Sequence, residues 1–174
     1  MNPILNVADA AAADITSEHG DFFACRATPL AEKLGATRIG VNLTTVPPGK
    51  AAYPYHHHHA NEEHFYVVRG TGRLRFGDAV HPLKPGDYVF CPPGGPEVAH
   101  QFLNDGTEDL VFLAFSTKQT PEVVGYPDSG KIGVRPVSYF LEGPHRFLVR
   151  EDQRDYDGYW NGEDASRFRH LLNR

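Results

Sequence analysis

The chain has 174 residues and a formal net charge of −5, with 17 basic and 22 acidic side chains. A chain of this length is expected to form one domain, and it lacks the basic field that would bind a nucleic-acid backbone. Its two cysteines, Cys25 and Cys91, are far apart, which excludes a disulfide framework and a structural zinc ribbon. With no secretory signal and no long apolar run visible, we expect a cytoplasmic protein with no membrane or nucleic-acid partner.

The distribution of glycine, proline and apolar residues predicts many short strands. Gly and Pro make up 31 of the 174 residues, about 18%, against roughly 12% in an average chain. Ile39, Val41 and Leu43 alternate with smaller or polar residues, as in a half-buried strand. Further apolar segments bounded by turn residues follow at 64–68, 73–76, 88–91, 98–103 and 110–115. Such regular spacing predicts an antiparallel β-sandwich or barrel.

We expect a single domain, 1–174, in three parts. The parts are an N-terminal arm over 1–35, a barrel core over 36–118, and C-terminal strands with an extension over 119–174. Smaller elements are predicted at the two ends: a helical turn over 8–13, strands over 22–25, 134–141 and 147–149, and a short C-terminal helix over 163–172.

Five of the ten histidines lie within nine residues: His56, His57, His58, His59 and His64. Alternate residues of a strand share a face, so His56 and His58 point together while His57 and His59 point the other way. Glu63 begins the next strand after a short bend, where it can meet one of these pairs. Two imidazoles and a carboxylate form a donor set that transition metals favour. The alternative is a solvated loop whose histidines only titrate.

Residues on both sides of this cluster resemble the two motifs of the cupin superfamily. The first motif is matched by Gly49, His56, His58, Glu63 and Gly70, with one extra residue before His56. The second is matched by Gly86, Pro92, Gly94, His100 and Asn104, with an insertion before His100. If His57 and His59 were the motif histidines, the gap between Gly49 and the first histidine would be even longer than the motif allows. The motif therefore favours His56 and His58.

The resemblance implies an all-β fold, the double-stranded β-helix or jelly roll, and one copy of each motif is typical of a monocupin. It implies that His56, His58, Glu63 and His100 bind one divalent transition metal: zinc, iron, manganese, nickel or cobalt. Since many monocupins pair through sheet edges, it also implies a homodimer.

The segments 59–70, 86–104 and 126–131 further resemble a small cupin group labelled sugar-phosphate-isomerase-like. This resemblance implies a small oxygen-rich substrate, and the preferred hypothesis is a metal-dependent isomerase or epimerase of a sugar or sugar phosphate. Glu97, in the insertion, is the candidate general base. Two alternatives stay open: an iron-dependent dioxygenase or manganese-dependent decarboxylase, and a non-catalytic module that binds a small ligand.

One further motif fragment is not expected to be functional. Gly125, Gly130 and Lys131 match part of a phosphate-binding loop, but Ile132 stands where Ser or Thr should hold magnesium. Gly133 and the proline that follows also disfavour the helix that such a loop requires. We therefore expect no nucleotide site there.

Overall fold

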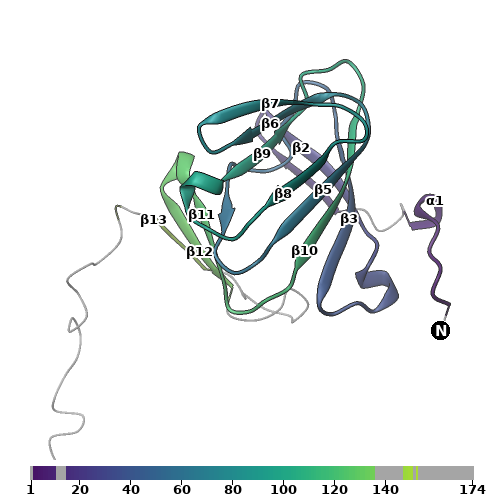
Figure 1. Cartoon of the computed structure of the whole chain (residues 1–174), viewed down its shortest axis with the longest axis horizontal. Helices are drawn as coiled ribbons and strands as arrows, with labels where there is room; N and C mark the ends of the chain where they lie inside the picture. Colours follow the sequence, from purple (N-terminus) through teal and green to yellow (C-terminus); the bar gives the residue numbers. More distant parts are fainter. Residues whose placement is uncertain (1, 11–14, 136–146, 151, 153–174) are drawn as a thin grey trace, which may run out of the picture.

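The structure is a computed structural model that describes residues 2–10, 15–135, 147–150 and 152. This part of the chain consists mainly of antiparallel strands, with one four-residue helix, α1 (Val7–Ala10), and a few short 3₁₀ turns. Figure 1 shows the strands wrapped around a common interior, with α1 on the side opposite β11, β12 and β13. None of the described helices has the length and apolar character needed to span a membrane.

The largest sheet has six strands in the order β1-β2-β3-β10-β5-β8. The strands are β1 (Ile15–His19), β2 (Phe23–Pro29), β3 (Ile39–Val46), β5 (Glu63–Arg69), β8 (Tyr88–Cys91) and β10 (Leu110–Thr117). All its pairings are antiparallel. β10 pairs with both β3 and β5, and this central position explains why its sequence is apolar almost throughout.

Two smaller sheets form the other side of the barrel. One has the order β7-β6-β9, from β6 (Gly72–Phe76), β7 (Ala79–Leu83) and β9 (His100–Leu103). The other has the order β13-β12-β11-β4, from β4 (His57–His58), β11 (Glu122–Tyr126), β12 (Lys131–Arg135) and β13 (Phe147–Arg150). An isolated antiparallel bridge between His56 and His100 joins the two smaller sheets.

The core lies between the two sides and ends at the histidine cluster. The rings of Phe65 and Phe112, from the large sheet, contact Phe102 of β9 at centroid distances of 4.6 and 4.4 Å. The next side chain of β9 on this face, His100, lies with its ring centroid 5.6 Å from that of Phe65. The aromatic core thus supports one wall of the polar cluster.

The predicted all-β jelly roll is confirmed, and most predicted strands lie within observed ones. The strand predicted over 98–103 begins only at His100, because Pro96–Val98 form a 3₁₀ turn, η3. Within the predicted arm, β1 and β2 extend the large sheet. The helix predicted over 163–172 lies outside the described residues, as does most of the strand predicted over 134–141.

The fragment that resembles a phosphate-binding loop folds as a strand, a turn and a second strand. Gly125 lies on β11, the 3₁₀ turn η4 (Pro127–Ser129) follows, and Lys131 begins β12. Because a strand follows where a nucleotide site requires a helix, the structure agrees with the expected absence of such a site in this segment.

Candidate metal centre

Four predicted side chains converge where the two smaller sheets meet the large one. His58 lies on β4, Glu63 begins β5 and His100 begins β9. His56 exchanges two backbone hydrogen bonds with His100, from His56 N to His100 O at 3.2 Å and from His100 N to His56 O at 2.8 Å. This backbone pairing fixes the separation of two of the imidazoles before any ligand binds.

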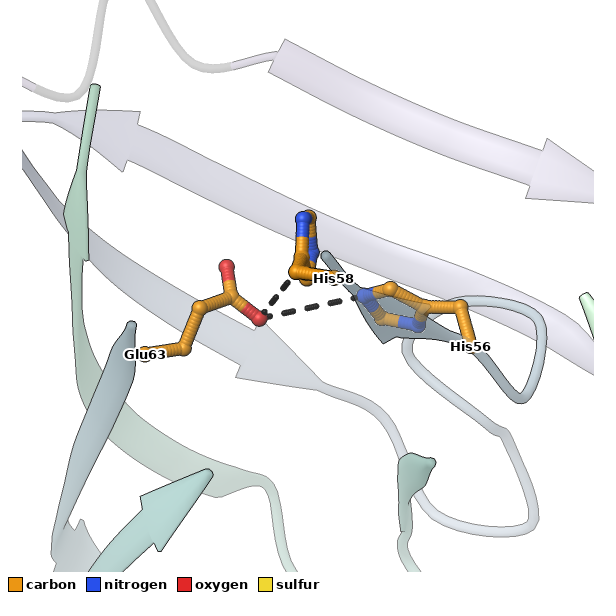
Figure 2. A group of neighbouring side chains, drawn as sticks. All are labelled: His56, His58 and Glu63. Carbon is orange, nitrogen blue, oxygen red and sulfur yellow. Dashed lines mark ion pairs between the residues drawn. The ribbon is translucent and has the colours of Figure 1, made fainter. Parts of the chain in front are cut away.

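Three imidazole nitrogens of the cluster lie close to the same carboxylate oxygen of Glu63. Its Oε2 lies 3.0 Å from Nε2 of His100, 3.3 Å from Nε2 of His58 and 3.8 Å from Nε2 of His56. Figure 2 shows His56 and His58 directed at this oxygen from neighbouring backbone positions. One ligand atom from each of His56, His58 and Glu63 lies within 4.8 Å of the other two.

The orientation of His56 is fixed from its far side. Its Nδ1 lies 2.8 Å from the carbonyl oxygen of Pro54. Because a carbonyl oxygen only accepts hydrogen bonds, Nδ1 carries the proton and Nε2 presents its lone pair to the cluster. This is the tautomer that a metal ligand needs.

Burial and neighbouring charges shift the pKa values of the side chains in the cluster in different directions. Burial and the neighbouring His100 imidazole lower the pKa of His56 to about 3. Burial also acts against a charge on His58, but the Glu63 and Glu122 carboxylates outweigh it and raise the pKa of His58 to about 9. Burial alone would raise the pKa of Glu63, yet His58 and His100 hold it well below its usual range. The ionised carboxylate is therefore balanced by a proton on His58.

This donor set fits a divalent transition metal. Three imidazole nitrogens and a half-buried carboxylate oxygen have the composition that such ions favour. A bound cation would also replace the single proton that balances this carboxylate. His56, His58, Glu63 and His100 are the residues that would hold the metal.

The other two histidines of the tract point away from Glu63, as strand alternation predicts. His57 is buried, and its Nδ1 donates to the carbonyl oxygen of Gly94 at 2.8 Å. The imidazole lies directly against Gly125, where a Cβ atom would clash with it. His59 is exposed. The tract thus has one face toward the candidate centre and one face that packs on β11.

Glu97 is not brought into the cluster. It lies in η3 with an exposed side chain, and its Oε1 accepts a hydrogen bond from Gly95 N at 2.9 Å. Hydrogen bonds from its own backbone and from Gly95 lower the pKa of Glu97, and the imidazoles that influence it are His57 and His59. A lowered pKa weakens a carboxylate as a base. The geometry gives the predicted role of Glu97 as general base no support.

Glu122 is a buried acidic residue behind the cluster that neither motif contains. Its side chain is 2% exposed, and its Oε2 lies 3.7 Å from Nδ1 of His58. Its other oxygen accepts hydrogen bonds from His59 N at 3.1 Å and Ala60 N at 3.2 Å, and Asn61 donates to Oε2. In the sequence, Glu122 could have been noticed as an acidic residue at the start of the apolar segment 122–126.

The fold and the site together define a jelly-roll protein with a cluster of histidine and glutamate side chains that could hold a metal ion. A family model described as a cupin domain matches residues 42–116, which include all four side chains of the cluster. None of the curated proteins matches this chain. The chain belongs to the cupin superfamily.

Three solved structures illustrate the similarity. A protein from Acidithiobacillus ferrooxidans ATCC 23270, provisionally named a sugar phosphate isomerase, is 32% identical, with a TM-score of 0.68 over 76% of this chain and 80% of its own. A cupin-superfamily sugar phosphate isomerase from Silicibacter pomeroyi DSS-3 is 27% identical, with a TM-score of 0.66 over 76% and 82%.

The third structure supports the fold alone. It is an uncharacterised conserved protein with a double-stranded β-helix domain from Klebsiella pneumoniae subsp. pneumoniae MGH 78578. It is 19% identical, with a TM-score of 0.52 over 67% of this chain and 90% of its own.

Proposed function

We propose that this cupin is a metal-dependent isomerase or epimerase of a small sugar or sugar phosphate. The observation that carries the proposal is the approach of three imidazole Nε2 atoms to one oxygen of Glu63. The names of the Acidithiobacillus and Silicibacter proteins support the choice of substrate class.

The cluster is closed on one side and open on the other, as a site that admits a ligand requires. The side chain of His100 is 3% exposed, whereas those of His56 and Glu63 are each 17% exposed. A substrate would therefore approach past His56 and Glu63. A metal bound there would polarise a carbonyl or hydroxyl oxygen of the substrate. Zinc, iron, manganese, nickel and cobalt all suit this donor set.

The test is a direct assay of interconversion. The full chain is loaded with each of the five metals in turn and incubated with a panel of aldose and ketose phosphates and free sugars. We expect interconversion of at least one pair, lost in Glu63→Gln and retained in Glu97→Gln. No interconversion with any metal would contradict the proposal, and iron-dependent oxygen consumption would indicate a dioxygenase instead.

A further inference from the structure

A row of neighbouring side chains leads from the candidate metal centre across the four-stranded sheet. His58 pairs with Val124 of β11, and Tyr126 lies two residues further along the same strand. Tyr126 pairs in turn with Lys131 of β12. Directly paired residues, and residues two apart on a strand, share one face of a sheet. Lys131 therefore lies on the same face as His58 and points to the same side of the sheet.

Ring contacts confirm that this row reaches the centre. The centroids of the Tyr126 and His56 rings are 6.2 Å apart, with an angle of 29° between the ring planes. The Nζ atom of Lys131 lies 5.7 Å from the centroid of the Tyr126 ring. At about 4.8 Å per strand, Lys131 is roughly 10 Å from the backbone of β4.

The charges of the described residues leave Lys131 available for an anion. No described carboxylate forms an ion pair with Lys131. Asp128, in the turn just before it, is held by both terminal nitrogens of Arg75 at 2.7 and 2.8 Å. Arg150 of β13 pairs with Lys131 in the sheet, but its guanidinium is already bound to Asp152 at 3.2 Å, so among the described residues the free positive charge here is that of Lys131. Tyr126 and Lys131 are both partly exposed, so a ligand can reach them.

We propose that Lys131 and Tyr126 form a subsite for the phosphate group of a sugar phosphate whose other end lies at the metal centre. The inference rests on the proposed function and narrows its substrate class to phosphorylated sugars. Lysine is a point charge that suits a phosphate, and the aromatic ring gives the sugar chain between the two ends a surface to pack against.

The experiment compares binding of matched ligands to the metal-loaded full chain. Calorimetry measures the Kd of hexose and pentose phosphates, beginning with glucose 6-phosphate and ribose 5-phosphate, against the corresponding free sugars. We expect the phosphorylated form of the substrate to bind at least about tenfold more tightly, as one charge-assisted contact would provide. Lys131→Met should remove this preference and leave the Kd of the free sugar within about twofold.

Lys84→Met, which changes an exposed lysine in the turn between β7 and β8, is the matched control and should keep the preference. Lys131→Gln serves as a second variant, and both Lys131 variants must keep the metal content of the wild type. A phosphate preference that is absent, or that survives in both Lys131 variants, would overturn the inference. An equal loss of affinity for sugar and sugar phosphate would also overturn it.

Binding and turnover can fail separately. A preference for phosphate that depends on Lys131, without interconversion of any sugar, would uphold the subsite and contradict the isomerase. Conversely, interconversion of sugar phosphates whose KM is unchanged in Lys131→Met would uphold the isomerase and contradict the subsite.

Discussion

Glu63 is the residue on which the candidate centre depends, because one of its oxygens meets three imidazole nitrogens. The motif resemblance could place His56, His58 and Glu63 in one cluster, since strand alternation and the spacing of the motif fix which side chains share a face. It could not place Glu122, which lies 64 residues beyond His58 and reaches it only through the pairing of β11 with β4. A contact between strands that are far apart in the sequence cannot be predicted from the spacing of residues within a motif.

The first prediction concerns Glu122. Glu122→Gln keeps the size of the side chain but removes the charge that faces Nδ1 of His58. Loss of such a partner behind a ligand commonly weakens metal binding by about 10-fold to 100-fold. A competition titration with a chromophoric chelator would measure this loss. The control is Glu62→Gln, which changes an exposed neighbour, and equal affinity in the two variants would refute the role of Glu122.

The second prediction concerns protons. In the metal-free protein the pKa of His58 is raised to about 9, chiefly by the Glu63 and Glu122 carboxylates acting against burial, so His58 is charged at neutral pH. A metal binds only the neutral imidazole, so binding near neutral pH should release about one proton per chain. Affinity should weaken as the pH falls below about 9, because protons then compete for His58 more strongly.

Calorimetry of metal binding in buffers with different ionisation enthalpies measures the number of protons released. Binding without net proton release near neutral pH would contradict the protonation of His58 that the structure indicates.

At the scale of elements, the two-residue strand β4 holds the site together. It carries His58 on the face of the metal centre and His57 on the opposite face, where the imidazole packs on Gly125 of β11. The longer strands could be predicted from the sequence, because their apolar pattern is sustained over several residues. The alternation of the four histidines agrees with a strand, but without an apolar pattern neither the length of β4 nor its pairing with β11 could be predicted. The 3₁₀ turn η3 could not be predicted either, because the insertion before His100 has no counterpart in the motif.

The third prediction tests this packing. In Gly125→Ala the new methyl group meets the ring of His57, and relieving that overlap should cost about 1–3 kcal/mol of the free energy of unfolding. His57→Ala removes the ring and also loses the hydrogen bond to Gly94. Because the double variant has no ring to meet the methyl group, its loss should be smaller than the sum of the single losses. Denaturant titration provides all three values, and strict additivity would contradict the proposed packing.

At the scale of the whole molecule, the two sides of the barrel enclose a core that ends at the candidate metal centre, and the described residues leave an apolar outer face on the large sheet exposed. Tyr66, Tyr88 and Phe90 are exposed on the same face of β5 and β8, and β8 is the edge of the large sheet. Exposed apolar patches of this kind often mark interfaces. The all-β class could be predicted from turn spacing alone, but which face remains uncovered depends on strand order, which the sequence does not reveal.

The fourth prediction is a homodimer, as expected from the resemblance to monocupins. Light scattering should give about twice the chain mass of 19.3 kDa. If the face of β5 and β8 forms the interface, Phe90→Glu should shift the mass toward the monomer, because burying a charge there is costly. Phe22→Glu, at an exposed aromatic residue elsewhere, should not. A monomeric wild type would contradict the dimer, and a dimer unaffected by Phe90→Glu would contradict this interface.

The central claim is that His56, His58, Glu63 and His100 bind a single metal ion. Elemental analysis of the purified chain after saturation with zinc and removal of free metal tests it most directly. We expect close to one zinc per chain in the wild type and in His59→Ala, and a loss of most of the metal in both His58→Ala and Glu63→Ala. Full zinc content in His58→Ala and Glu63→Ala, or an equal loss in His59→Ala, would contradict the claim.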